Sequence, residues 1–255
     1  MAQLNNPKRD GNDPSSGGTG SSFSVNSFGL LISDPPGSRA FAEGIAAAEH
    51  ALKAGEWVGV YLLDEAVQGV GEAALSRMGD QGMHLSACSH AARLFGVPLT
   101  SSAIFGGLSI LGDLLANVSR FAHASRAGFF ERAPAPRPRG SLRRVLMESA
   151  GDPRVSHKPS EAVRCGIGLG AWSQVEVHFC FIGESCRILA EEWAGFRGEE
   201  LLERYVPMLK DWPNPIQALE PTTDLSAVTS RAHLAMRQHR ELGTVENSHD
   251  LVLRL

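Results

Sequence analysis

Residues 57–67 read WVGVYLLDEAV, a continuous apolar run that ends in an acidic turn. The run has no polar alternation and is too short for a buried helix, so it predicts a strand covered on both faces of a sheet. An alanine-rich, helix-like segment precedes it at residues 38–54 and is closed by Gly55. Before that segment, residues 28–33 (FGLLIS) form another short apolar run. Strand, helix and strand in this order are typical of a parallel α/β sheet.

The same alternation extends outward from this core in both directions. In the first half we expect further helices at residues 66–78, 88–95 and 109–117, and strands at 83–87 and 120–124. In the second half we expect strands at residues 142–148, 175–182 and 250–255, and helices at 159–172 and 199–209.

The two halves of the chain are related in pattern. Residues 43–48 (EGIAAA) align with residues 161–166 (EAVRCG) without a gap, and this register places the strand at 57–63 over VEVHFCF at 175–181. A repeat of this spacing is a whole domain and not one turn of a solenoid. We therefore expect an α/β protein made of two tandem flavodoxin-like domains, each a mostly parallel sheet flanked by helices.

Composition changes mark the expected domain limits. Residues 1–25 are rich in Gly, Ser, Asn and Asp and are expected to form a disordered tail. The segment RAPAPRPRG at residues 132–140 favours an extended spacer, since proline removes backbone donors. We therefore expect one domain at residues 26–125, a Pro/Arg-rich linker at 126–140 and a second domain at 141–255.

The overall balance of charge argues against several classes of partner. Of 255 residues, 43% are hydrophobic, and 24 Lys+Arg against 28 Asp+Glu leave a net charge of −4. That weakly acidic balance gives no general attraction to nucleic acid or to an anionic membrane. The chain shows neither an apolar run of the roughly 18–20 residues that span a bilayer nor a secretory signal. We expect a cytoplasmic protein with no direct contact to membrane or nucleic acid.

The chain has 4 cysteines, and their spacing matches neither a metal site nor a disulfide framework. Cys165 falls in a predicted helix and Cys180 in a predicted strand, so both are expected to be packed in the core. Cys186 follows that strand in a turn, and for it a redox role stays open.

Cys88 is the residue with the clearest chemical potential, in MHLSACSHAAR at residues 83–93. It stands where a predicted strand ends and a helix begins, at the edge where open α/β sheets bind ligands. If Ser86 caps that helix, Cys88 lies in the first turn, where the helix dipole favours a thiolate. A cysteine packed in the core is the alternative, because free cysteines are among the most buried residues.

Residues 84–96 (HLSACSHAARLFG), followed by FGGLSILGDL at 105–114, resemble the DsrE/TusD family of small sulfur-relay proteins. The likeness extends over residues 26–125 and includes the strand that ends in DEAV at 64–67. It implies that Cys88 carries a persulfide sulfur and exchanges it with small donor and acceptor proteins that bear reactive cysteines. It also places the protein in sulfur oxidation or tRNA thiolation. The exchange needs no metal and no cofactor.

The second half is similar to the DsrF/TusC branch of the same superfamily. The likeness lies in SEA at residues 160–162, the strand at 175–181 and GES at 183–185. The segment expected to carry the equivalent cysteine, residues 214–225 (NPIQALEPTTDL), contains none. The second half is therefore expected to be a non-catalytic partner that shapes the site.

Further residues near Cys88 are candidates for supporting roles. His84 and His90 are each placed to take a proton from the thiol, although a solvated or packed histidine is the alternative. A loop at residues 98–105 and the glycines after it are expected to cover the site, through Ser101, Ser102, Phe105, Gly106 and Gly107. The glycines of GIGLG at residues 166–170 are expected to allow close helix packing and not to bind a nucleotide.

These observations favour a persulfide sulfurtransferase that uses Cys88, and they leave two alternatives. One is a non-catalytic binding or scaffold module of the same fold with a buried Cys88. The other is a thiol redox sensor in which Cys88 is oxidised and Cys186 resolves it. We also expect the protein to assemble into homo-oligomers.

Overall fold

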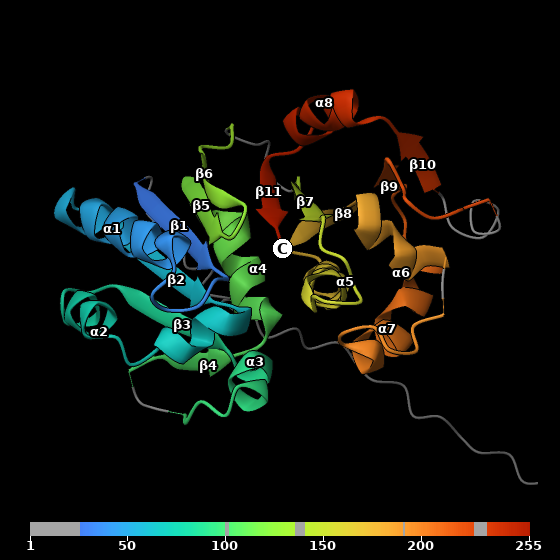
Figure 1. Ribbon diagram of the computed structural model, residues 1–255. Coiled ribbons are helices and arrows are strands. Elements are labelled where there is room, and N and C mark those ends of the chain that lie inside the picture. Colours follow the sequence, from blue (N-terminus) through green and yellow to red (C-terminus); the bar gives the residue numbers. More distant parts are fainter. Residues whose placement is uncertain (1–25, 100–101, 136–140, 191, 227–233) are drawn as a thin grey trace, which may run out of the picture.

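The computed structural model describes residues 26–99, 102–135, 141–190, 192–226 and 234–255. The expected fold class is confirmed: the chain is an α/β protein with two mostly parallel sheets flanked by helices, as in two tandem flavodoxin-like domains (Figure 1). Among these residues no helix combines the length and the apolar character that crossing a membrane requires.

The first sheet has six strands in the order β4-β3-β2-β1-β5-β6. All neighbouring strands are parallel except β5 and β6, which are antiparallel. The strands are β1 (Ser27–Ile32), β2 (Trp57–Leu62), β3 (His84–Cys88), β4 (Ile104–Gly106), β5 (Arg120–Ser125) and β6 (Gly128–Arg132).

The second sheet has five parallel strands in the order β10-β9-β8-β7-β11. They are β7 (Arg143–Ser149), β8 (Val175–Ile182), β9 (Ile216–Leu219), β10 (Leu234–Arg237) and β11 (Leu251–Arg254). In both sheets the chain runs outward from the first strand through the next three and then returns to the other side of the first. This shared order agrees with the duplication that the sequence pattern indicates.

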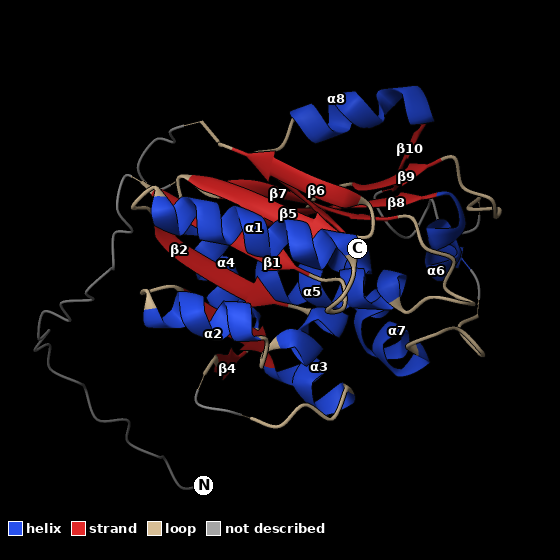
Figure 2. Cartoon of the chain, turned by 60° about the vertical axis from the view of Figure 1, so that its left-hand side comes forward, coloured by secondary structure: helices blue, strands red, loops and turns tan. Residues whose placement is uncertain are grey.

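Helices connect the strands in each half. In the first half they are α1 (Arg39–Lys53), the 3-10 helix η1 (Asp64–Gly69), α2 (Ala73–Asp80), α3 (Ser89–Leu94) and α4 (Leu108–Asn117). In the second half they are α5 (Lys158–Ala171), η2 (Gly183–Cys186), α6 (Arg187–Ala190), α7 (Glu199–Tyr205), η3 (Val206–Asp211), η4 (His239–Glu241) and α8 (Leu242–Asn247). Figure 2 shows α1 lying across the strands of the first sheet, with α2 beside it.

Local sequence explains why α1 begins and ends where it does. The Ser38 hydroxyl accepts a hydrogen bond from the Phe41 backbone N–H at 3.1 Å, which caps the first turn. Gly55 follows the helix at a φ of +77°, a left-handed conformation that glycine adopts without a side-chain clash. The strand β1, which precedes α1, is buried along its whole length, as expected for a strand covered on both faces of the sheet.

The two halves pack against each other through α4 and α5, which face one another between the sheets (Figure 1). Gly168 on α5 makes this possible, because a Cβ at that position would collide with Leu108 on α4. Gly166 and Gly170 on the same helix lie just as close to Phe179 and Trp212. The GIGLG glycines therefore permit close packing, as the sequence indicated. One contiguous hydrophobic cluster includes side chains of both sheets.

Several expectations for individual segments are wrong. Residues 128–132, assigned to the linker, form the antiparallel strand β6 instead. The helices expected at residues 66–78 and 199–209 are each divided between a 3-10 helix and an α-helix. The strands β4, β9 and β10 and the helix α8 were not anticipated. The disordered tail expected at residues 1–25 lies outside the described residues.

Candidate functional site

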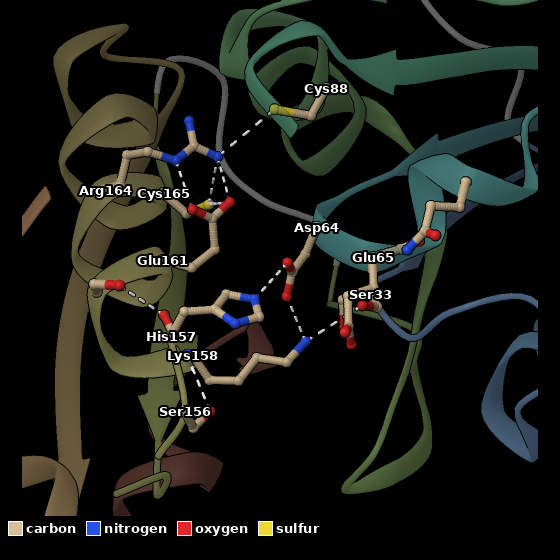
Figure 3. Close-up of polar contacts among 12 residues, drawn as sticks. Ser33, Asp64, Glu65, Cys88, Ser156, His157, Lys158, Glu161, Arg164 and Cys165 are labelled. Atoms are coloured by element: carbon tan, nitrogen blue, oxygen red, sulfur yellow. Dashed lines mark hydrogen bonds and ion pairs between the residues drawn. The ribbon is translucent and has the colours of Figure 1, made fainter. Parts of the chain in front are cut away.

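The carboxyl ends of the first sheet's strands face the first turns of α5, a helix of the second half (Figure 3). β2 ends next to Asp64, and β3 ends at Cys88. α5 presents His157, its N-cap residue, and further along Arg164 toward them. The candidate site is thus built by both halves, at the sheet edge where α/β proteins bind ligands.

Cys88 ends β3 and is the N-cap residue of α3, with φ −67° and ψ 115°. It therefore occupies the helix start that the sequence predicted. The residue is only 1% exposed, as in the alternative of a cysteine packed in the core. Arg164 Nη2 donates to Cys88 Sγ across 3.6 Å. Arg164 therefore brings a guanidinium of the second half against the sulfur of Cys88.

Arg164 is held in place by its own helix. Its Nε donates to Glu161 Oε2 at 2.7 Å, and its Nη2 also pairs with Glu161 Oε1. Burial disfavours the charge on Arg164, but Cys165, Glu161 and Cys88 around it more than offset that effect and raise its pKa. The site therefore keeps a buried Arg164–Glu161 ion pair whose guanidinium lies next to the sulfur of Cys88.

Cys165 is the second sulfur at this cation. Its Sγ lies 3.4 Å from Arg164 Nη2 and 3.5 Å from Glu161 Oε1. Burial and the negative charge of Glu161 raise its pKa well above the ordinary value for a thiol. We expected only a packed core residue here, and Cys165 is indeed fully buried. No sequence pattern indicated that Cys165 and Cys88 contact the same guanidinium.

Only some of the residues expected to support Cys88 lie close to it. Ser86 lies within β3 and does not cap α3, because Cys88 itself is the N-cap residue. His84 is at the opposite end of β3, where its ring stacks on Trp57 with centroids 5.1 Å apart. His90 lies in the first turn of α3, and burial together with the charge of Arg164 lowers its pKa. His90 is thus the histidine that belongs to this neighbourhood.

The expected cover loop is also different. Phe105 and Gly106 belong to β4, and Gly106 pairs directly with Cys88 across the β3–β4 ladder. Gly107 is the N-cap residue of α4, and its carbonyl oxygen accepts a hydrogen bond from the buried Tyr61 hydroxyl at 3.1 Å. Ser102 lies in an exposed turn, and Ser101 lies outside the described residues. Phe105, Gly106 and Gly107 therefore flank the site as a strand and a helix start and do not form a loop over it.

Three residues to which the sequence analysis assigned no role in the site, Asp64, His157 and Lys158, connect the halves beside Cys88. Asp64 is 2% exposed and accepts hydrogen bonds from His157 Nε2 at 2.7 Å and Lys158 Nζ at 2.6 Å. Burial works against a charged Asp64, but these two partners outweigh it and hold the pKa of Asp64 below its ordinary value. The hydrogen bond to Asp64 in turn raises the pKa of His157.

Asp64 holds an unusual backbone conformation, with φ at +56°. Its counterpart in the second half is Gly183, at φ +58°. Aspartate tolerates this left-handed region better than most residues but less well than glycine. In the alignment of the two halves, Asp64 stands where the second half has Gly183. An aspartate at a position that suits glycine was the sequence signal that could have identified Asp64 as a functional residue.

Cys180 and Cys186 are packed away from this site. Both are fully buried, and the Cys186 thiol donates to the Phe181 carbonyl oxygen at 3.3 Å. Burial raises the pKa of Cys186 to about 12. Thiol reactivity requires the thiolate, so Cys186 is poorly suited to a redox role. No group of three or more metal-ligating side chains occurs in the part of the chain that the structure describes.

Comparisons with known proteins add little. The chain matches no protein-family model, and no curated protein matches its sequence. Among solved structures, the ychN protein from E. coli matches with a TM-score of 0.36 and 16% identity, over 45% of this chain and 100% of that one. A match of this strength supports no inference about this chain.

Proposed function

We propose that the chain is a sulfur carrier similar to the DsrE/TusD proteins, with Cys88 as the sulfur-bearing residue. The observation that carries the proposal is the position of Cys88 at the start of α3, with Arg164 of the second half 3.6 Å from its sulfur. The second half, which lacks a cysteine equivalent to Cys88, then has a defined role, because it supplies the cation that stabilises the thiolate.

The transfer is a thiolate exchange. The Cys88 thiolate attacks the outer sulfur of a donor persulfide, a new S–S bond forms, and the donor leaves as a thiolate. An acceptor thiolate then attacks that outer sulfur, and Cys88 leaves as the thiolate that Arg164 stabilises. Donor and acceptor are small proteins with reactive cysteines, in sulfur oxidation or tRNA thiolation, and the site is proposed to work in the cytoplasm within a homo-oligomer.

A donor protein cannot reach the sulfur of Cys88 in the structure as it stands. Cys88 is 1% exposed, with α3 on one side and α5 on the other, so a donor can reach it only after these elements separate locally. α3 is a single short helix of 6 residues, and it is the smaller of the two elements to displace. Partner docking that shifts α3 would therefore expose the sulfur.

Mass spectrometry after incubation with a persulfide donor tests the proposal. We expect Cys88 to gain about 32 Da, one sulfur atom, and the Cys88→Ser variant to gain none. Cys180→Ser is the matched control, because Cys180 is a buried cysteine away from Arg164, and it should load as the unmodified protein does. Equal loading of Cys88→Ser and the unmodified protein would refute the proposal.

The burial of Cys88 favours a second candidate, a non-catalytic binding or scaffold module in which this cysteine is inert. In that case native Cys88 reacts with alkylating agents no faster than the buried Cys180. A redox sensor that pairs Cys88 with Cys186 has less support. Arg164 contacts the sulfurs of Cys88 and Cys165, so the second cysteine at this site is Cys165 and not Cys186.

A further inference from the structure

A pocket of about 400 Å³ lies beyond the carboxyl ends of β5, β7 and β11, at the start of α5. In the second sheet, β7 and β11 are the neighbours between which the chain order reverses. Crevices outside the carboxyl ends of strands at such a switch point are where open α/β sheets bind small molecules. The volume is within the range of about 300–1,000 Å³ that is typical of small-molecule sites.

Basic side chains from both halves line this pocket. They are Arg126, His157, Lys158 and Arg254, and Glu65 is the one carboxylate side chain among the described lining residues. Three of these cations form ion pairs with carboxylates that do not line the pocket. Asp64, 2% exposed, binds His157 and Lys158, and Glu148, 3% exposed, binds Arg254 Nε at 2.9 Å. Glu246, which is only partly buried, also binds Arg254, at Nη2 across 2.5 Å. The cations are thereby fixed in position, and of the carboxylates that fix them Asp64 and Glu148 are buried.

Two lining residues have unused hydrogen-bonding capacity. The Arg126 side chain is exposed and makes no hydrogen bond or ion pair with the residues that the structure describes. The Ser125 hydroxyl is buried, with the residue 3% exposed, and it has no hydrogen-bond partner in the described part of the chain. A buried hydroxyl without a partner is uncommon in a native protein and calls for an explanation such as a ligand or a bound water.

We propose that this pocket binds the phosphate group of a small molecule. Several fixed cations, a free guanidinium, a hydroxyl and the positive end of the 14-residue helix α5 together match a multiply charged oxyanion. A carboxylate would use fewer of these groups, and the pocket is larger than a bare phosphate ion. The pocket shares His157 and Lys158 with the junction beside Cys88, but the proposal does not depend on the sulfur chemistry there.

Calorimetric titration of the full chain at constant ionic strength tests this proposal, with inorganic phosphate, glucose 6-phosphate, AMP and succinate as probes. We expect saturable binding of phosphate and tighter binding of at least one of the two phosphate esters. Arg126→Gln should weaken binding about tenfold, as expected when a charged hydrogen bond is lost. Arg77→Gln, an exposed arginine on α2, is the matched control and should leave binding unchanged.

Ser125→Ala adds a second, independent readout. Because its hydroxyl has no partner, its removal should not lower the stability of the free protein, yet it should weaken binding of the phosphate ester several-fold. The proposal is overturned if no phosphate compound binds saturably, if succinate binds more tightly than all of them, or if Arg126→Gln and Arg77→Gln behave alike.

Discussion

At the scale of the residue, the chemistry depends on which atoms surround the sulfur of Cys88. The sequence identified this cysteine from its place at a strand–helix junction, and the structure puts it there. Arg164, Glu161 and Cys165 were not predictable as neighbours, because they come from the other half of the chain and meet Cys88 only through the packing of α5. The local pattern around Cys88 contains no information about that contact.

Removal of the Arg164 charge should slow sulfur loading. In Arg164→Gln the cation beside Cys88 is lost, and we expect the rate of persulfide formation on Cys88 to fall about tenfold or more, since hydrogen bonds to charged groups contribute about 1.5–3 kcal/mol. Time-resolved mass spectrometry measures that rate. Because Arg164→Gln leaves Glu161 buried without its partner, the double variant with Glu161→Gln separates loss of chemistry from loss of folding. An undiminished rate in both variants would show that Arg164 does not activate the sulfur.

Asp64 combines a strained backbone with an ionic role, and two substitutions separate these effects. Asp64→Ala and Asp64→Gly both lose the contacts to His157 and Lys158, but only alanine keeps the strain at φ +56°. We expect Asp64→Gly to be more stable than Asp64→Ala by about 1–2 kcal/mol, the cost of the left-handed region for a residue with a Cβ. Urea unfolding measures the difference. Equal stabilities would mean that the backbone relaxes at this position.

At the scale of the element, continuous apolar strands and capped helices were predictable, and short edge elements were not. β8 was expected at residues 175–182 and occupies those residues, because it is rich in hydrophobic residues and five of its eight residues are buried. β4 and β10 are edge strands of 3 and 4 residues, too short for a periodic pattern. β6 was missed because it pairs antiparallel to β5 directly before the proline-rich segment, where composition suggested a linker.

The packing of α4 on α5 predicts opposite effects on stability when each of two glycines is replaced by alanine. A Cβ at Gly168 would collide with Leu108, so Gly168→Ala should destabilise the protein despite the better helix propensity of alanine. A Cβ at Gly112 on α4 would meet Gln174 and Leu169 at 3.8 Å, an ordinary contact. Gly112→Ala should therefore stabilise the protein by up to about 1 kcal/mol. Thermal unfolding of both variants checks the signs, and two changes of the same sign would contradict this account of the interface.

At the scale of the whole molecule, the two halves act as one structure and not as independent domains on a linker. They share a continuous hydrophobic cluster, and buried and partly buried hydrogen bonds join them. One of these runs from the Arg254 backbone N–H of β11 to Nδ1 of His123 on β5, at 3.0 Å. His123 Nε2 lies 3.1 Å from the Ser33 hydroxyl, so with Nδ1 as acceptor the neutral ring donates from Nε2.

The buried His123 should make the joined halves labile in acid. Burial, reinforced by the charges of Lys158 and Arg254, lowers the pKa of His123 from 6.5 to about 3. Between these values the unfolded chain takes up a proton that the folded chain does not, so the free energy of unfolding falls as pH is lowered from 6.5 toward 3. The slope from this group is about 1.4 kcal/mol per pH unit.

Urea unfolding at several pH values measures that slope in the unmodified protein and in His123→Gln. We expect the variant to be less stable at neutral pH but to lose less stability over the same acid range. A slope that is the same in both proteins would assign the acid sensitivity to other groups.

The central claim is that Cys88 is a reactive sulfur at the junction of the two halves, and its alkylation in the native protein tests that claim most directly. A small neutral alkylating agent is applied without denaturant, and the modified fraction of each cysteine is followed over time by peptide mass spectrometry. We predict that Cys88 reacts well before Cys165, Cys180 and Cys186, as local movement of α3 exposes it. If Cys88 reacts no faster than the other three, and only under conditions that unfold the chain, it is a structural core residue and the sulfur-carrier account is contradicted.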